Sequence, residues 1–415
     1  MENKELDVAI IGGGQAGLSM SHCLMSRGLN NHLIFERNQL GHSWRNERWD
    51  SFCLVTPNFQ CRLPGYDYDG TDPNGFMLKN EIVAFIERYA KSFNPPLMEG
   101  VTVNSVLLRK AGFTVETSSG SWNTQQVVIA TGAYHRPRKL PGSQKIPGSI
   151  MQIHSAEYKN PKQIPDGEVI VVGSAQSGCQ IAEDLHLEGR KVHLCLGSAP
   201  RSPRFYRGRD VVDWFEEMGH YDKPIHEFEN PEEVRHETNH YLTGRDGGRE
   251  MDLRQFALEG MSLYGFLESI DASGFNVRPD VNEKLDLADE TYVRLRNIID
   301  KYILNQGLEI PSEEPYIPVW KPNVEQTRLN FADQRISAII WAIGFAPEFG
   351  FVKAPVFDNK GYPCCVRGVT DCPGLYFLGL PWLYTWGSGR FAGVARDADY
   401  LAEKIALREP IHAPI

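Results

Sequence analysis

The hydrophobic positions of the chain form the same pattern twice, about 160 residues apart. Each copy begins with a short apolar run, at 8–11 and at 169–172, which leads into a turn of small residues and then into a helical pattern. Each helical pattern is followed by a second apolar run, at 31–36 and at 191–196. A strand, a helix and a second strand in this order make a βαβ unit with parallel strands. The pattern therefore predicts two parallel sheets covered by helices.

The remaining hydrophobic runs predict further elements around these two units. Between the copies they predict a helix over 80–92 and strands near 101–108, 113–117 and 126–130. After residue 200 the chain is charged and irregular until about residue 255. Beyond that they predict a long helix over 281–305, strands at 336–342 and 375–378, and a closing helix within 387–407. The last part of the chain thus returns to βα order.

This order predicts an α/β fold with two dinucleotide-binding, Rossmann-like domains, the second inserted into a discontinuous first. A chain of 415 residues, 41% of them hydrophobic, is long enough for two such cores. We expect residues 1–160 and 330–415 to form one domain and 161–329 the other. The segment 160–167 is rich in proline and polar residues and predicts a hinge, with a return crossing near 318–322.

The first turn has the spacing Gly-x-Gly-x-x-Gly, formed by Gly12, Gly14 and Gly17. The first glycine permits a tight turn, the second lets a pyrophosphate approach the backbone, and the third lets the helix pack against the strand. The helix then presents its free N–H groups to the phosphates. Glu36 ends the next strand, where a carboxylate binds a ribose diol. Together these features predict a dinucleotide site, and a helix-capping turn without a ligand is the alternative.

The second turn reads Gly173-x-Ala175-x-x-Gly178, with an alanine at the middle position. Alanine is still small, so the same geometry remains accessible. The second copy therefore predicts a second dinucleotide site.

The end of the following strand determines which dinucleotide this second site prefers. It carries Ser198 in place of an acid, and Arg201 and Arg204 follow. A missing acid and nearby arginines suit a 2′-phosphate, so the sequence predicts NADPH, with NADH possible. The alternative is that both arginines are solvated loop charges.

The overall charge excludes several classes of partner. The net charge is −10 and the sequence pI is about 5.7, which argues against a nucleic-acid surface and against binding to an anionic membrane. No secretory signal and no membrane-spanning run is evident, so a cytoplasmic location is expected. None of the eight cysteines forms a Cys-x-x-Cys pair, so neither a metal site nor a dithiol is predicted.

Four further segments carry a resemblance to a known family. They are Gly41–Arg45, Val128–Tyr134, Trp341–Phe345 and Pro373–Gly379. With the two glycine turns, they resemble the class B flavin monooxygenase superfamily, which includes flavin-containing, Baeyer–Villiger and YUCCA-type monooxygenases. The resemblance covers nearly the whole chain and is closest to an unassigned bacterial flavoprotein branch.

The resemblance implies an enzyme that holds FAD at the first turn and NAD(P)H at the second. Such an enzyme would insert one oxygen atom from molecular oxygen into a small organic substrate through a C4a-(hydro)peroxyflavin. Neither the substrate nor the oligomeric state is predicted. In this chemistry the flavin does the difficult step, so few acid–base residues are expected.

The resemblance and the two turns together give a set of candidate site residues. The catalytic candidates are Asn58 and His154, for which an Asx turn and a structural histidine are the respective alternatives. Trp44 and Trp386 are candidates to flank the isoalloxazine ring, or else are ordinary core residues. The cofactor-binding candidates are Gly12, Gly14, Gln15, Ala16, Gly17, Glu36, Arg37, Ser43, Trp44, Arg45, Val103, Ala130, Thr131, Gly132, Gly173, Ala175, Gln176, Ser177, Gly178, Ser198, Arg201, Arg204, Ile343, Gly344 and Gly379.

One family motif is incomplete and leaves other functions open. His154 and Tyr158 match the right half of the superfamily fingerprint, whereas Gly148–Ile150 lacks the phenylalanine and glycine of the left half. The alternative is a non-oxygenating flavoprotein: an NAD(P)H oxidase, a dehydrogenase or a disulfide reductase. The adjacent Cys364 and Cys365 would be a poor dithiol, because a disulfide between neighbouring residues is strained.

Overall fold

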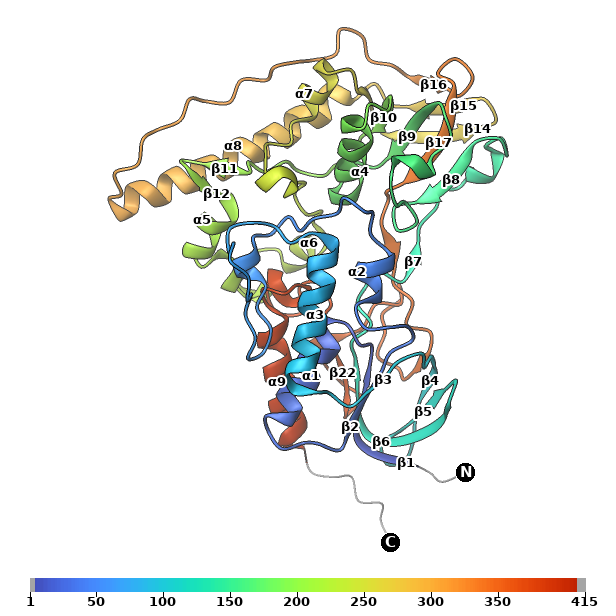
Figure 1. Ribbon diagram of the computed structural model, residues 1–415, viewed down its shortest axis with the longest axis vertical. Helices are drawn as coiled ribbons and strands as arrows, with labels where there is room; N and C mark the ends of the chain where they lie inside the picture. The colour runs from blue at the N-terminus through green and yellow to red at the C-terminus, as the bar shows by residue number, and fades with distance from the viewer. Residues whose placement is uncertain (1–3, 409–415) are drawn as a thin grey trace.

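The computed structural model describes residues 4–408, and Figure 1 shows two lobes, one above the other. The lower lobe holds the first βα unit and the C-terminal helix. The upper lobe holds the second βα unit and the long helix α8. The predicted fold class, two Rossmann-like units with one inserted into the other, is confirmed.

The lower lobe is built on a ten-stranded sheet centred on β1 (Lys4–Ile11). β1 runs parallel to β2 (His32–Phe35) on one side and to β6 (Gly120–Ile129) on the other. β22 (Leu375–Phe377) pairs in parallel with β6, so the end of the chain rejoins this sheet. Its remaining strands are β3 (Leu97–Met98), β4 (Val103–Leu108), β5 (Phe113–Thr117), β19 (Val352–Lys353), β20 (Cys365–Val366) and β21 (Val369–Thr370).

Three helices cover one face of this sheet: α1 (Gln15–Met25), α3 (Lys79–Phe93) and α9 (Val394–Ala406). Their apolar faces meet in one core, which includes Leu18, Phe85 and Leu401. α1 and α9 pack directly against each other, although they are separated by most of the chain. The first and last helices therefore hold the lobe together.

The upper lobe is built on a five-stranded sheet in which every pair is parallel. Its strands, in spatial order, are β13 (Ser262–Tyr264), β10 (Val192–Cys195), β9 (Glu168–Val172), β17 (Ile336–Trp341) and β8 (Met151–His154). α4 (Gln176–Leu187) and α7 (Leu253–Leu258) pack on one face. A small antiparallel sheet packs on the other, formed by β14 (Leu267–Asp271), β15 (Gly274–Val277) and β16 (Arg328–Asn330).

The predicted domain boundaries at 160 and 330 are wrong. β8 lies before residue 160 and β17 lies after residue 330, yet both belong to the upper sheet. The chain passes between lobes at β7 (Arg136–Pro137) and β18 (Phe345–Ala346), which pair with each other. The segment 160–167 is therefore an internal loop of the upper lobe and not a hinge. The predicted return crossing near 318–322 also lies within the upper lobe, since the carbonyl of Trp320 accepts a hydrogen bond from Arg254 of α7.

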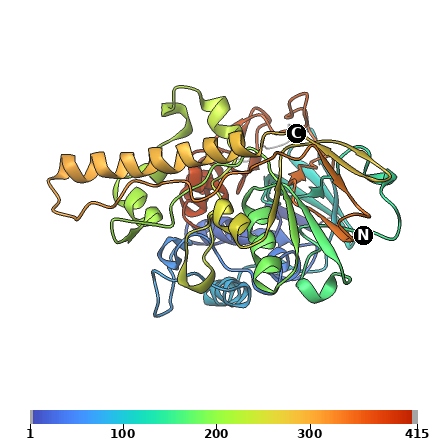
Figure 2. The same cartoon turned by 90° about the horizontal axis from the view of Figure 1, so that it is seen from above.

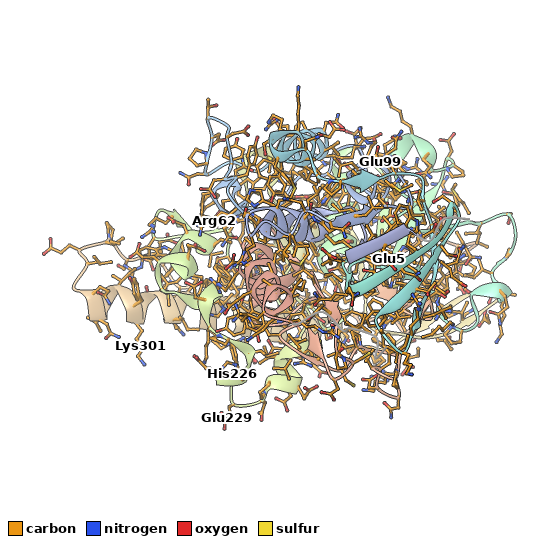
Figure 3. All side chains as sticks on the ribbon, turned by 90° about the horizontal axis from the view of Figure 1, so that it is seen from below. Glu5, Arg62, Glu99, His226, Glu229 and Lys301 are labelled. Carbon is orange, nitrogen blue, oxygen red and sulfur yellow. The ribbon has the colours of Figure 1, made fainter. Side chains whose placement is uncertain are left out.

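A long helix extends from the upper lobe. α8 (Val281–Gln306) has 26 residues, and Figure 2 shows its C-terminal part projecting beyond the body. Lys301 lies on this projecting part, as Figure 3 shows. The helix is anchored by α5 (Val211–Glu217), whose Trp214 shares an apolar cluster with Ile299. The shorter helices are α2 (His42–Asn46) and α6 (Pro231–His236), and the shorter strands are β11 (Phe205–Tyr206) and β12 (Arg209–Asp210).

Candidate functional site

Both glycine turns open onto one cavity of about 1200 Å³. The first turn contributes Gly12 and Gly14, and the second contributes Ala175 and Ser177. Two dinucleotides bound at the two turns would therefore extend into a shared space. Of the predicted cofactor residues, those lining the cavity are Gly12, Gly14, Gln15, Ala16, Glu36, Arg37, Ser43, Trp44, Val103, Ala130, Thr131, Gly132, Ala175, Gln176, Ser177, Gly344 and Gly379.

The three glycines of the first turn are each required for a different reason. Gly12 has φ +108°, and a Cβ there would lie 2.6 Å from the carbonyl oxygen of Ala130. A Cβ on Gly17 would lie 1.9 Å from the oxygen of Gly12, so only glycine lets α1 approach β1 this closely. A Cβ on Gly14, in contrast, would meet nothing within 4 Å. Because Gly14 lines the cavity, that open space is where a pyrophosphate fits.

Glu36 is held in place beside the first turn. One of its carboxylate oxygens accepts a hydrogen bond from the backbone N–H of Gly13 at 2.7 Å, and the other accepts one from Asn38 at 2.8 Å. The side chain also lines the cavity. A carboxylate fixed by two backbone donors still has lone pairs for a ribose diol. The residues of the first turn therefore fit an adenosine dinucleotide.

The second turn repeats this geometry. Gly173 has φ +102°, and a Cβ there would lie 2.6 Å from the carbonyl oxygen of Ala342. A Cβ on Gly178 would lie 1.8 Å from the oxygen of Gly173. The backbone of Ala175 at φ −76°, ψ −176° matches that of Gly14 at φ −75°, ψ −172°. The loss of the middle glycine therefore leaves the turn unchanged.

The segments after β6 and β17 are also equivalent. Ala130 and Ala342 present their carbonyls to the first glycine of each turn. Two residues later, Gly132 and Gly344 have φ +74° and +78°, a left-handed conformation that glycine adopts readily. Both glycines line the cavity. The similarity of these two segments in sequence thus reflects the same backbone path.

An aromatic wall lies next to the first turn. The indole of Trp44 stacks on Phe391 with 5.8 Å between ring centroids, and its Nε1 donates to Oε1 of Gln15 at 3.4 Å. Gly379 lines the same cavity next to the start of α1, since a Cβ there would lie 2.6 Å from the Cβ of Ala16. The aromatic side chains of Trp44 and Phe391 offer flat surfaces that suit a planar ring.

The prediction that Arg201 and Arg204 bind the 2′-phosphate of NADPH is wrong. Arg201 is 2% exposed, and its guanidinium pairs with Glu250, Asp252 and Asp289 at 2.8–3.1 Å. Arg204 is fully buried and pairs with Asp210 at 2.5 Å. Neither residue lines the cavity.

Each of these guanidinium groups is already neutralised by carboxylates, so neither is free to bind a 2′-phosphate. The alternative of solvated loop charges is equally wrong, because both side chains are buried.

The two catalytic candidates are structural. Asn58 is 3% exposed, donates to the carbonyl of Asp72 at 2.9 Å and accepts from the N–H of Met77 at 2.7 Å. His154 is fully buried, and its Nε2 lies 3.1 Å from the carbonyl oxygen of Gly344. Burial lowers the pKa of His154, so the ring is neutral at pH 7. Neither side chain lines the cavity, and His154 instead positions the Gly344 turn.

Six other predicted residues lie outside the cavity lining. Gly17, Gly173 and Gly178 act through backbone packing, as described above. Arg45 pairs with Glu87 at 2.5 Å on the surface. Ser198 is exposed at the end of β10, and Ile343 packs against the core of the upper lobe.

The segment 238–242 contributes to the cavity, although none of its residues was among the predicted site residues. Asn239, His240 and Leu242 line the cavity. The amide of Gln176 donates to the carbonyl of Leu242 at 2.5 Å and accepts from its N–H at 3.1 Å, which fixes the segment across the start of α4. Only the irregular composition of this stretch could have suggested it.

Two other types of site are not found within residues 4–408. All eight cysteines lie in this part of the chain and are free, and none lines the cavity. No group of histidine, cysteine, aspartate or glutamate side chains there could hold a metal ion. None of the helices described is both long and apolar enough to cross a membrane.

A family model described as pyridine nucleotide-disulphide oxidoreductase matches residues 9–256, more than half of the chain. The chain belongs to this family. The matched region begins in β1 and includes both glycine turns, the two parts of the cavity that bind dinucleotides in such proteins.

Two curated relatives show to which branch of this family the chain is similar. An uncharacterized CzcO-like oxidoreductase of Geobacillus kaustophilus is 30% identical over 407 residues, which cover 96% of this chain and 98% of that protein. The probable indole-3-pyruvate monooxygenase YUCCA1 of Arabidopsis thaliana is 31% identical over 192 residues, covering 45% of this chain and 46% of that protein. These relatives confirm the predicted class B flavin monooxygenase superfamily and its bacterial branch.

A solved structure has the same fold. The flavin-containing monooxygenase of Stenotrophomonas maltophilia superposes with a TM-score of 0.68 at 18% identity, covering 97% of this chain and 98% of that one. Family and relatives together identify this chain as an NAD(P)H-dependent flavoprotein oxidoreductase.

Proposed function

We propose that the chain is an FAD-dependent monooxygenase that consumes NADPH and inserts one oxygen atom into a small organic substrate. The observation that carries the proposal is the opening of both glycine turns onto one cavity. A hydride can pass only between rings in contact, and a shared cavity allows a nicotinamide to reach a flavin. When bound and reduced, FAD supplies the activation of molecular oxygen.

The residues of this chain bind and orient the two cofactors. Gly14 leaves room for the pyrophosphate of FAD at the N-terminus of α1, and Glu36 accepts hydrogen bonds from its ribose. Gln176 and Ser177 offer the N-terminus of α4 to the second dinucleotide. Trp44 and Phe391 form an apolar wall that excludes water from the reacting rings.

The preference for NADPH rests on the end of β10. A carboxylate there would bind the 2′-hydroxyl of NADH and repel a 2′-phosphate. This chain has Gly197 and Ser198 instead. Ser198 is exposed and so leaves space for the phosphate, without help from Arg201 or Arg204.

Three measurements test the proposal. Flavin released from the purified protein should be FAD. Anaerobic mixing with NADPH should bleach the flavin absorbance faster than mixing with NADH. On admission of oxygen, one oxygen atom from labelled O₂ should appear in a substrate. Rapid reoxidation that returns all reducing equivalents as hydrogen peroxide, with any substrate present, would instead establish the alternative, an NAD(P)H oxidase.

A disulfide reductase lacks support among the cavity residues. That reaction needs a dithiol beside the flavin, and all eight cysteines lie outside the cavity lining. Burial also raises the pKa of Cys53 to about 11 and of Cys61 to about 12, so neither is a reactive thiolate.

A further inference from the structure

An aromatic compartment, formed by Tyr221, Trp386, Arg390 and Asn239, lines part of the cavity. Tyr221 and Trp386 contact each other with 4.5 Å between ring centroids, and the guanidinium of Arg390 lies 3.9 Å from the ring centre of Trp386. Asn239 completes the group, and all four residues line the cavity. The compartment therefore presents a cation among aromatic rings to whatever occupies the cavity.

Arg390 is half-buried in the cavity wall, and its hydrogen-bond partners differ from those of the buried arginines Arg201, Arg204 and Arg254. Its Nη2 donates to Oδ1 of Asn239 at 2.7 Å and its Nη1 donates to the carbonyl of Trp386, so both partners are neutral. Arg201, Arg204 and Arg254, in contrast, all form ion pairs with carboxylates. No carboxylate within residues 4–408 pairs with Arg390.

This charge is costly where it lies. Burial lowers the pKa of Arg390, but a guanidinium remains protonated at physiological pH. A half-buried cation without a counter-ion is less stable than one in water, and an anion placed next to it offsets part of that penalty. The positive charge of Arg390 is thus not compensated by a carboxylate of the described residues.

Two neighbouring arginines, Arg48 and Arg294, add to the positive charge of the cavity. Arg48, on the same cavity, lies 5.1 Å from the ring centre of Trp44, and the adjacent Glu47 partly offsets its charge. Arg294 lines the cavity close enough to His240 to lower the pKa of that ring. Of the acidic residues that line the cavity, Glu36 is held at the first turn, Glu47 adjoins Arg48, and Glu237 and Glu348 are exposed.

We propose that Arg390 binds the carboxylate of an aromatic acid, whose ring lies against Trp386 and Tyr221. This rests on the proposed function and names the substrate class for it. A carboxylate accepts two parallel hydrogen bonds from a guanidinium, and the aromatic side chains offer flat faces to the ring. The pyrophosphates of the two dinucleotides have their own donors at the N-termini of α1 and α4, so neither pyrophosphate requires Arg390.

The test compares a charged with an uncharged probe of the same shape. Phenylacetate and phenylacetamide are titrated separately into the purified flavoprotein by calorimetry, with acetate as a third probe. Phenylacetate should bind at least tenfold more tightly than either of the others. Arg390→Gln should abolish that preference, and Arg390→Lys should restore part of it. Arg278→Gln, which removes an exposed arginine paired with Glu268, is the matched control and should keep the preference.

Several results would overturn the proposal. Equal affinity of wild-type protein for the acid and the amide would do so, and this needs no variant. A preference that survives in Arg390→Gln would also do so, as would loss of NADP⁺ affinity in this variant with phenylacetate binding intact, because Arg390 would then serve the dinucleotide. Calorimetry requires no turnover, so a protein that fails to react with NADPH would overturn the proposed function while leaving the acid preference measurable.

Discussion

Nη1 of Arg201 lies 2.8 Å from Oδ1 of Asp289, which joins the loop after β10 to α8. Replacing Arg201 with alanine would leave Glu250, Asp252 and Asp289 close together without their shared cation. We expect Arg201→Ala to lower the free energy of unfolding by about 3–5 kcal/mol, the usual result of breaking a buried pair. Urea denaturation measures this change. The ratio of specificity constants for NADPH and NADH should stay the same, and a change in it would show that Arg201 acts on the cofactor.

Ser198 offers the complementary test of cofactor choice. Ser198→Glu places a carboxylate at the end of β10, where it would repel a 2′-phosphate and accept a hydrogen bond from a 2′-hydroxyl. The specificity constant for NADPH should fall by about tenfold or more, since one lost charge-assisted contact is worth about 1.5–3 kcal/mol. Rapid-reaction measurements of flavin reduction with both cofactors check this. Ser198→Gln, which has the same size without the charge, should have little effect.

Gly14 is expected to control flavin binding without affecting the fold. A valine side chain there meets no protein atom close to its Cβ, yet it fills the space next to the N-terminus of α1. Purified Gly14→Val should therefore keep its melting temperature in the flavin-free form and lose most of its bound FAD. The ratio of flavin to protein absorbance gives the answer directly, and a variant with full flavin content would contradict the first dinucleotide site.

Gly17 is expected to behave in the opposite way. Its Cβ would lie 1.9 Å from a backbone oxygen, so Gly17→Val must push α1 away from β1. We expect a strongly destabilised or insoluble protein, whether FAD is added or not. Thermal denaturation of the two variants side by side separates a ligand-contact glycine from a packing glycine.

His240 should make stability depend on pH. Burial, then Arg294 and His220, lower its pKa to about 4, whereas an unfolded histidine titrates near 6.5. Between these values the unfolded state binds the extra proton, so the stability present above pH 6.5 is lost as the pH falls toward 4. His240→Gln should reduce the loss of unfolding free energy between pH 7 and 5 by about 1–2 kcal/mol. Urea denaturation of both proteins at the two pH values measures it, and parallel losses would contradict the assignment.

The elements of the fold could be predicted because local sequence determines them. Apolar runs and small-residue turns gave β1, α1, β9 and α4 within a few residues. The sheet to which a strand belongs is a different matter. β8 is short and apolar like its neighbours, and its pairing with β17 depends on a residue separation of nearly 200, which no local pattern encodes.

In the candidate site, too, residues set by local sequence could be predicted, whereas residues that depend on distant segments could not. The glycines and Glu36 could be found because their spacing is set by one strand–turn–helix unit. Arg201 could not be interpreted from its neighbours, since the acids that neutralise it come from α8 and from the loop before α7. Arg390 was missed for the converse reason, because the absence of a carboxylate partner is visible only in three dimensions.

The paired strands β7 and β18 determine how this protein can be dissected. A fragment cut at residues 160 and 330 would lack both β8 and β17, and so would expose the middle of a parallel sheet to solvent. The lower lobe, made from the flanking pieces, would carry those two strands as unpaired apolar tails. A separately expressed upper lobe must instead run from the ribbon at 136–137 to its partner at 345–346, whose hydrogen bonds bring the new ends together. The same closeness makes a short linker sufficient to rejoin the lower lobe once the upper one is removed.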